Sequence, residues 1–193
     1  MTEPPSGPIP VHPSVAAVIL AAGASTRFGS PKQLARVGER TMLEAVVGIA
    51  REAGLHPILA VVPPRLAVPP DVVPVPNGEP EQGMSRSLKL GIAALPAEVD
   101  AAVVLLGDQP TLPVASVAAI VAARGARPII AAASDGLAVP PVLVERRAFD
   151  IVQELEGDTG LREIIRHDAL LVHTVSVEAV PADVDTPADL DLL

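Results

Sequence analysis

Short apolar runs alternate with helix-like segments along almost the whole chain. The runs expected to be strands are residues 15–22, 56–62, 71–77, 100–108, 127–134, 138–144 and 170–177. The segments with a helical pattern are residues 41–54, 83–95, 114–125, 146–157 and 159–167, and a last helix is expected to start at residue 186. Continuously apolar strands separated by helices are typical of a parallel sheet that is covered on both faces. The pattern therefore predicts an α/β protein.

Chain length and the uninterrupted pattern predict one domain. The chain has 193 residues, which suits a single hydrophobic core. We expect a single-domain, Rossmann-like three-layer sandwich with a mostly parallel sheet over residues 15–193, preceded by a Pro-rich flexible leader at residues 1–14. Such sheets bind ligands beyond the carboxyl ends of their strands. The loops expected to carry function are those after Ala22, Asn77, Leu106 and Ser134.

Charge and composition exclude several classes of partner. The formal net charge is −9, from 14 Lys and Arg against 23 Asp and Glu. Because no Lys/Arg-rich run occurs, neither a nucleic acid nor an anionic membrane is an expected partner. The chain has no cysteine, which excludes disulfides and thiolate chemistry and fits a cytoplasmic protein. With two Phe and no Tyr or Trp, a nucleotide base would be held by backbone groups and aliphatic contacts.

The loop "AGASTRFGSPKQL" at residues 22–34 follows the first expected strand. Its small residues, Gly23 and Ser25 among them, allow close approach of a ligand, and successive backbone N–H groups in such a loop form an anion nest. Arg27 and Lys32 add two cations suited to phosphate. The glycine spacing matches neither a P-loop nor the dinucleotide fingerprint. Two interpretations stay open for the loop by itself, a triphosphate site or an ordinary turn with two solvated cations.

Carboxylates follow other expected strands. Asp108 ends the most apolar run, "DAAVVLLGD", where it would hold a divalent cation at the ligand-binding edge or serve only as a turn residue before a proline. In "VDTPADL", Asp185 is either a metal ligand or the cap of the last helix, and the pattern favours the cap. Asp183 is a weaker candidate.

A further polar cluster lies at the start of the helix expected over residues 83–95. Gly83, Ser85 and Ser87 lie at the expected start of this helix. At a helix start, backbone N–H groups that have no partner within the helix, together with side-chain hydroxyls, bind a base or an anion. Simple N-capping is the alternative.

Taken together, these stretches resemble a known family. "LAAGASTRFGSPKQL" is similar to the nucleotidyltransferase signature L-A-A-G-x-S-x-R-x-G-x-x-K-x-L and matches every fixed position from Leu20 to Leu34. "NGEPEQGMSRSLKLG", "GDQP", "LEGDTGLR" and "VDTPADL" follow in the order of the molybdenum cofactor cytidylyltransferases. The chain departs from that branch at Phe28, where Met is usual, and at "DGLAVPPVLV", where Gly-His-Pro or Gly-Asn-Pro is frequent.

The resemblance implies the nucleotide-diphospho-sugar transferase fold and Mg²⁺-dependent transfer of CMP from CTP to the terminal phosphate of molybdopterin. It implies catalytic roles for Arg27, Lys32 and Asp108, and Mg²⁺ ligation by Asp108 and Asp185. The nucleotide-binding residues it implies are Leu20, Ala21, Ala22, Gly23, Ser25, Arg27, Lys32, Asn77, Gly83, Ser85, Ser87 and Asp108. A molybdenum enzyme or its chaperone would be a transient protein partner.

Three alternatives to this activity remain. The same fold would serve another phosphomonoester acceptor, such as a sugar phosphate. A second alternative is an NAD(P)H-dependent reductase that uses the same cleft. The third is a nucleotide-binding or cofactor-handover protein without turnover, which the combination of Arg27, Lys32 and Asp108 disfavours.

Overall fold

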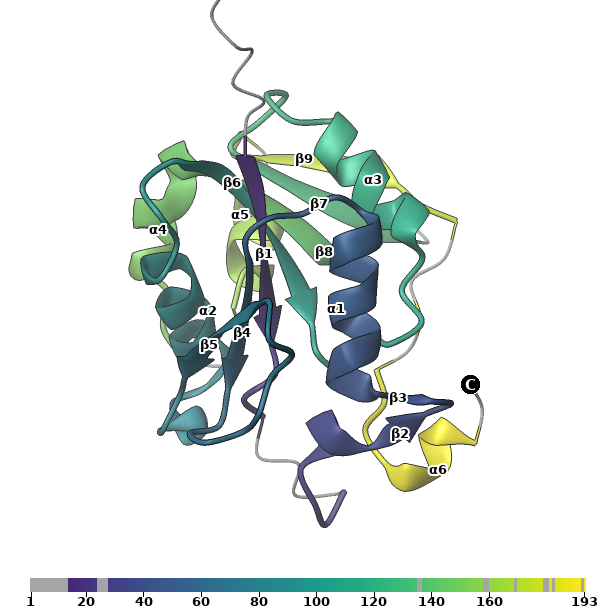
Figure 1. The fold of residues 1–193 in the computed structure, drawn as a ribbon. Helices are drawn as coiled ribbons and strands as arrows, with labels where there is room; N and C mark the ends of the chain where they lie inside the picture. The colour runs from purple at the N-terminus through teal and green to yellow at the C-terminus, as the bar shows by residue number, and fades with distance from the viewer. Residues whose placement is uncertain are drawn as a thin grey trace, which may run out of the picture.

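The computed structural model describes residues 14–23, 28–134, 137–157, 160–168, 170–178, 181, 183–191 and 193. In this part of the chain, seven strands form one sheet in the order β5-β4-β1-β6-β8-β7-β9 (Figure 1). Their bounds are β1 (Ser14–Leu20), β4 (Ile58–Val62), β5 (Val72–Pro76), β6 (Val99–Leu106), β7 (Ile129–Ser134), β8 (Leu137–Glu145) and β9 (Val172–Ser176). Two short strands, β2 (Arg36–Val37) and β3 (Arg40–Thr41), form a separate hairpin. The predicted α/β architecture is confirmed.

Helices cover both faces of the sheet. On one face lie α1 (Met42–Glu52) and α3 (Val114–Ala122), and on the other α2 (Met84–Ala93), α4 (Phe149–Gln153) and α5 (Arg162–His167) (Figure 1). Neighbouring residues of β1 supply both layers: Ala17 and Ile19 pack in one apolar core, and Ala16 and Val18 in the other. β1 is thus buried on both sides, which explains its continuous apolar sequence.

One strand of the sheet runs against the others. β8 pairs antiparallel with both β6 and β7, whereas the pairs of β1 with β4 and β6, of β4 with β5 and of β7 with β9 are parallel. Only two residues separate β7 from β8, and a parallel pair needs a crossover of about a dozen residues. The mostly parallel sheet that the sequence predicts is therefore confirmed, with β8 as its antiparallel member.

The helices are shorter than the sequence pattern predicts. The segment at residues 146–157 begins with the 3-10 turn η3 (Arg146–Ala148) before α4, and the segment at 159–167 contributes only α5. The last helix, α6 (Pro187–Leu190), is a single turn. Two further 3-10 turns, η1 (Lys32–Leu34) and η2 (Pro80–Gln82), lie in loops that the pattern left without structure.

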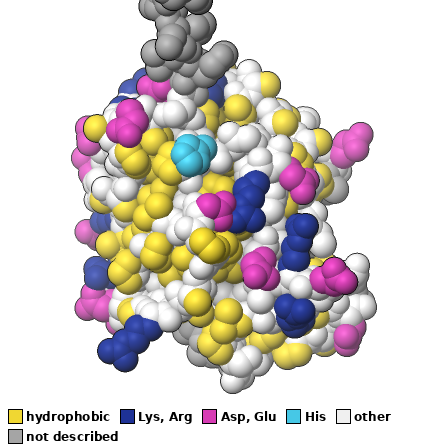
Figure 2. All heavy atoms as spheres, in the orientation of Figure 1, with side chains coloured by type: hydrophobic (Ala, Val, Ile, Leu, Met, Phe, Trp, Pro, Cys, Tyr) yellow, Lys and Arg dark blue, Asp and Glu magenta, His cyan; other side chains and the backbone are white. Residues whose placement is uncertain are grey.

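The first residue that the structure describes is Ser14. Ser14, the last residue of the predicted leader, is already the first residue of β1, and residues 1–13 lie outside the described residues. On the face shown in Figure 2, cationic and acidic side chains are interspersed and do not gather into a basic patch. No helix in the described ranges is long and apolar enough to cross a membrane.

Candidate functional site

A cavity of about 190 Å³ opens at the carboxyl edge of the sheet, where β1 and β6 end side by side. Residues from six separate stretches of the chain line it. These lining residues are Leu20, Ala21, Ala22, Gly23, Lys32, Gln33, Pro80, Gly83, Met84, Ser87, Leu106, Gly107, Asp108, Arg162 and Asp183. Three of the four loops chosen from sequence, those after Ala22, Asn77 and Leu106, thus meet at one site.

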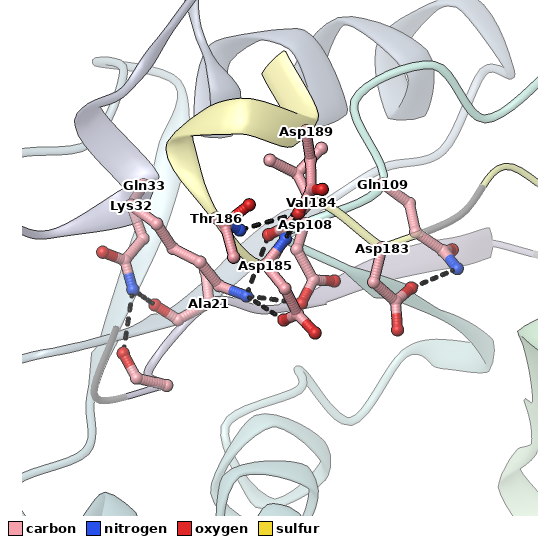
Figure 3. Close-up of polar contacts among 11 residues, drawn as sticks. Ala21, Lys32, Gln33, Asp108, Gln109, Asp183, Val184, Asp185, Thr186 and Asp189 are labelled. Atoms are coloured by element: carbon pink, nitrogen blue, oxygen red, sulfur yellow. Dashed lines mark hydrogen bonds and ion pairs between the residues drawn. The ribbon is translucent and has the colours of Figure 1, made fainter. Parts of the chain in front are cut away.

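Lys32 is the central cation of this site. Its Nζ donates to Asp108 Oδ2 at 2.7 Å, lies 3.7 Å from Asp185 Oδ1, and donates to the Val184 carbonyl at 3.4 Å (Figure 3). The side chains of Lys32 and Asp108 are 16% and 21% exposed. Because water is largely excluded, this ion pair is stronger than one on an open surface.

Backbone hydrogen bonds bring the C-terminal segment to Asp108. The Val184 N–H donates to the Asp108 carbonyl at 2.9 Å, and Val184 itself is buried. Gln109 Nε2 donates to Asp183 Oδ1 at 2.9 Å. Asp183 and Asp185 therefore lie on either side of Val184, which its hydrogen bond to Asp108 holds next to the end of β6.

The helix-capping role favoured for Asp185 is wrong. Thr186 is the N-cap of α6 and forms a capping box with Asp189. Asp189 Oδ2 accepts from the backbone N–H groups of Asp185 and Thr186 at 2.9 and 2.7 Å. The cap thus employs the backbone of Asp185, and its carboxylate faces Lys32.

Three carboxylates around one lysine give the site an excess of negative charge. Burial raises the pKa of Asp183 above its usual value, and the charges of Asp108 and Asp185 raise it further, against the hydrogen bond from Gln109 and the charge of Lys32. Part of the Asp183 side chain reaches solvent, so we expect a modest rise. An additional cation in this group is therefore electrostatically favourable.

Gly107 is needed for the close approach of β6 to β1. A Cβ on Gly107 would lie 2.7 Å from Ala21 Cβ and 3.0 Å from the Leu20 carbonyl oxygen. The backbone N–H of Gly107 donates to the same Leu20 oxygen at 2.9 Å. Since Asp108 is the next residue, this contact sets the position of the carboxylate.

Replacing Gly107 by Ala is expected to lower the free energy of unfolding by about 1–3 kcal/mol, because backbone atoms must move to admit the methyl group. Urea unfolding measures the loss. The matched control is Gly78→Ala, whose Cβ would meet only Pro64 Cγ at 3.8 Å, and it should stay within about 0.5 kcal/mol of the wild type. Equal effects of the two changes would contradict the close approach at Gly107.

Gln33 holds the loop of Lys32 against the end of β1. Its side chain is 2% exposed, and Nε2 donates to the carbonyl oxygens of Ala21 at 2.6 Å and Gly23 at 3.3 Å. Its buried Oε1 has no hydrogen-bond partner among the described residues. Gln33 was not a candidate from sequence, where only its neighbour Lys32 stands out.

We predict that Gln33→Leu lowers the free energy of unfolding by about 1–3 kcal/mol, since two carbonyl groups lose their donor in a buried place. Chemical denaturation checks this value. Gln153→Leu is the control, because Gln153 Nε2 donates to the Lys89 carbonyl at 3.3 Å on an exposed surface. A Gln33→Leu protein as stable as Gln153→Leu would show that the buried amide does not hold the loop.

Of the polar residues predicted near the start of α2, some line the cavity and others form hydrogen bonds that support the start of α2. Gly83 and Ser87 line the cavity. Asn77, by contrast, is buried: its Nδ2 donates to Ser87 Oγ at 2.9 Å and its Oδ1 accepts from the Glu79 N–H at 3.0 Å. Ser85 Oγ donates to the Gly157 carbonyl at 2.6 Å. Asn77 and Ser85 thus brace the start of α2 and are not among the residues that line the cavity.

Two predicted site residues, Ser25 and Arg27, lie outside the described residues. The structure also adds Gln109 and Met84 to the site, which the sequence offered only as parts of the motifs "GDQP" and "NGEPEQGMSRSLKLG". Arg162 also lines the cavity, although the sequence offered it only as part of the motif "LEGDTGLR".

The donor set fits a hard divalent cation that a substrate helps to bind. Within the described ranges, no group of three or more His, Cys, Asp or Glu side chains is placed to hold a metal ion. Mg²⁺ is commonly held by one or two carboxylates together with substrate phosphates, and it prefers oxygen ligands. Asp108 and Asp185 provide such a pair, currently shared by the ammonium group of Lys32.

Comparisons with known proteins found a family model and similar solved structures. A family model described as the MobA-like NTP transferase domain matches residues 17–174. The crystal structure of Rv0371c from Mycobacterium tuberculosis H37Rv superposes with a TM-score of 0.80 at 29% identity, over 93% of this chain and 96% of that one. A manganese complex of Rv0371C matches with a TM-score of 0.76 at 26% identity, over the same shares. The chain has the nucleotide-diphospho-sugar transferase fold.

Curated relatives carry more than one activity in their names. The nicotine blue oxidoreductase of Paenarthrobacter nicotinovorans is 31% identical over 90% of this chain and 93% of its own length. The 2-C-methyl-D-erythritol 4-phosphate cytidylyltransferase of Streptomyces avermitilis is 34% identical over 61% of this chain and 52% of that protein. The bifunctional protein GlmU of Hyphomonas neptunium is 37% identical over 53% of this chain, which spans about a quarter of that protein.

Proposed function

Because the chain belongs to the MobA-like NTP transferase domain family, we propose that it transfers CMP from CTP to a phosphomonoester, with molybdopterin as the acceptor and pyrophosphate as the second product. The observation that carries this proposal is the group of Lys32, Asp108 and Asp185 beside the cavity at the ends of β1 and β6. Such a group suits a triphosphate that arrives with a divalent cation.

The reaction requires positioning and neutralisation of charge more than proton transfer. The second pKa of a phosphomonoester is about 6, so the acceptor is largely ionised at neutral pH and needs no general base. An acceptor oxygen forms a bond to the α-phosphorus of CTP, while the bond from that phosphorus to the bridging oxygen of the β-phosphate breaks. The bridging oxygen keeps the electron pair and leaves as part of pyrophosphate.

Residues of this chain would align the reactants. Gly23, three residues after β1, and Gly83, just before α2, line the cavity without side chains and so allow close approach of phosphates and base. Lys32 would neutralise charge that develops on the leaving pyrophosphate. Asp108 and Asp185 would hold Mg²⁺, which supplies Lewis-acid polarisation of phosphate oxygens when bound.

Support for the nucleotide and the acceptor comes from likeness to named proteins. CTP is proposed because of the motif order and the likeness to a cytidylyltransferase. Molybdopterin is proposed from the same motif order, and a sugar phosphate or another alcohol phosphate is the alternative acceptor. A transient contact with a molybdenum enzyme or its chaperone would follow if molybdopterin is the acceptor.

A second candidate function is an NAD(P)H-dependent reductase. The match to nicotine blue oxidoreductase over nearly the full length of both proteins favours it. The pyrophosphate of a nicotinamide cofactor would then occupy the cavity in place of a triphosphate. Hydride transfer, however, gives no role to the paired carboxylates Asp108 and Asp185.

The two candidates differ in what they consume. The purified protein is mixed with Mg²⁺ and with CTP, GTP or ATP, in the presence of molybdopterin or 2-C-methyl-D-erythritol 4-phosphate. Pyrophosphate is measured, and the nucleotidylated product is identified by mass spectrometry. The proposal predicts pyrophosphate with CTP and molybdopterin. Consumption of NADPH by a pigment substrate, without pyrophosphate from any pair, would support the reductase instead.

A further inference from the structure

A second recess, of about 40 Å³, opens beside the cavity on the α2 and α5 side of the sheet. The two spaces share Leu20, Met84, Leu106 and Arg162. The other walls of the recess are apolar side chains of α2, β6, β8 and the segment from Leu161 to Ile165. Arg162 is the one polar side chain among the described residues that line it. The recess is therefore continuous with the proposed nucleotide site but chemically different from it.

Arg162 stands at the junction of these two spaces. Arg162 is exposed, and its side chain makes no hydrogen bond or ion pair with the residues that the structure describes. The other cation that lines the larger cavity, Lys32, is already paired with Asp108 and Asp185. A planar guanidinium offers two parallel donors to phosphate oxygens. An incoming phosphate would thus find in Arg162 a cation that pairs with none of the described carboxylates.

We propose that Arg162 binds the phosphate of the acceptor, and that the recess takes up a compact nonpolar group attached close to that phosphate. This inference rests on the proposed function, because it requires the nucleotide to occupy the larger cavity. The recess does not suit the nucleotide, since a cytosine edge or a ribose hydroxyl placed there would lose its hydrogen bonds to water without gaining partners. For the same reason, the site disfavours polyol phosphates whose first carbons carry hydroxyl groups.

The volume and the lining of the recess predict a measurable preference. In the presence of α,β-methylene-CTP and Mg²⁺, the binding of inorganic phosphate and of methyl, ethyl and propyl phosphate is measured by calorimetry. Each methylene that enters the recess should raise the affinity about fourfold, which corresponds to about 0.8 kcal/mol per buried CH₂. The gain should stop once the recess is full. Glycerol phosphate should bind more weakly than propyl phosphate of the same chain length.

Two substitutions test separately how the charge of Arg162 and the volume of the recess contribute to binding. Arg162→Gln should weaken all the phosphates about 10–100-fold and keep the gain per methylene, because only a charge-assisted hydrogen bond is lost. Ala138→Leu should fill the recess and abolish the gain, while inorganic phosphate binds as before; Ala138→Val is the milder change if the leucine variant does not fold. Arg147→Gln, at an exposed arginine outside both spaces, is the control.

The outcomes separate this inference from the proposed function. If α,β-methylene-CTP binds but the alkyl phosphates show no gain with chain length, or if Arg162→Gln binds them like Arg147→Gln, the inference is overturned and the proposed function stands. If α,β-methylene-CTP does not bind the wild-type protein with Mg²⁺, both fall.

Discussion

Replacing Asp108 by Asn is expected to lower kcat for pyrophosphate release about 10²–10³-fold, the usual cost of removing one preorganised electrostatic group from an active site. Asn keeps the size of the side chain but removes the charge that pairs with Lys32 at 2.7 Å and that would help to hold Mg²⁺. The effect should therefore appear in turnover, with the fold retained.

Stability should change little in the same variant. One lysine faces three carboxylates, Asp108, Asp183 and Asp185, so their formal charge of 1 − 3 = −2 becomes −1 when Asp108 is neutralised. The lost attraction to Lys32 is offset by relieved repulsion, and the free energy of unfolding should stay within about 1 kcal/mol of the wild-type value. Asp100→Asn is the matched control, because this exposed carboxylate lies at the opposite end of β6. A folded Asp108→Asn protein that turns over like Asp100→Asn would remove Asp108 from the mechanism.

The second large effect is expected for Lys32→Met. The value of kcat/KM for CTP should fall about 10²–10³-fold, because the triphosphate loses the cation that meets its developing charge. In the absence of nucleotide, by contrast, Mn²⁺ should bind the variant about tenfold more tightly. The ammonium group of the wild type neutralises Asp108 and Asp185, so an entering cation must displace it.

Electron paramagnetic resonance titration of Mn²⁺ measures the second effect independently of turnover. Lys89→Met, a change at the chain's other lysine, is the control and should match the wild type in both measurements. If Lys32→Met used CTP as well as Lys89→Met does, Lys32 would have no part in binding the triphosphate. Unchanged Mn²⁺ affinity would show that the ammonium does not compete with the cation.

The sequence predicted the core of the fold because both faces of the central strands are buried. Residues 100–108 were predicted to be the most apolar strand, and β6 occupies residues 99–106 of the structure, with Asp108 just beyond its end. The sequence also contained enough information to predict that β8 runs antiparallel, since the dipeptide Asp-Gly between two apolar runs is a strong hairpin signal. The helical pattern overestimated helix length at residues 146–167 because apolar periodicity does not mark the ends of short helices.

The candidate site was predictable only in part, for a physical reason. Lys32 and Asp108 are charged residues in loops that meet at the edge of a parallel sheet, and this edge is known from topology alone. Gln33 acts through buried hydrogen bonds to Ala21 and Gly23, which leave no trace in a sequence pattern. The position of Asp185 depends on the hydrogen bond from Val184 to Asp108, a contact between residues 76 positions apart.

Asn77 illustrates how a residue implied by the family resemblance can have a supporting position. Its buried side chain forms hydrogen bonds with Ser87, Arg86 and the Glu79 backbone. Asn77 is a polar residue at the ligand-binding edge of the sheet, and its side chain supports Ser87 in the wall of the cavity. The structure alone distinguishes such support from contact.

The central claim is that the cavity at the ends of β1 and β6 binds a nucleoside triphosphate with a divalent cation, and thermal unfolding with added nucleotide tests it most directly. Binding to the folded state alone raises stability by about 2.7 kcal/mol at a ligand concentration of 100 times Kd. CTP, GTP, ATP and NADPH are compared with and without Mg²⁺. The account predicts a rise in Tm with CTP that requires Mg²⁺ and is lost in Asp108→Asn. Stabilisation by NADPH that is independent of Mg²⁺, with none by any triphosphate, would contradict it.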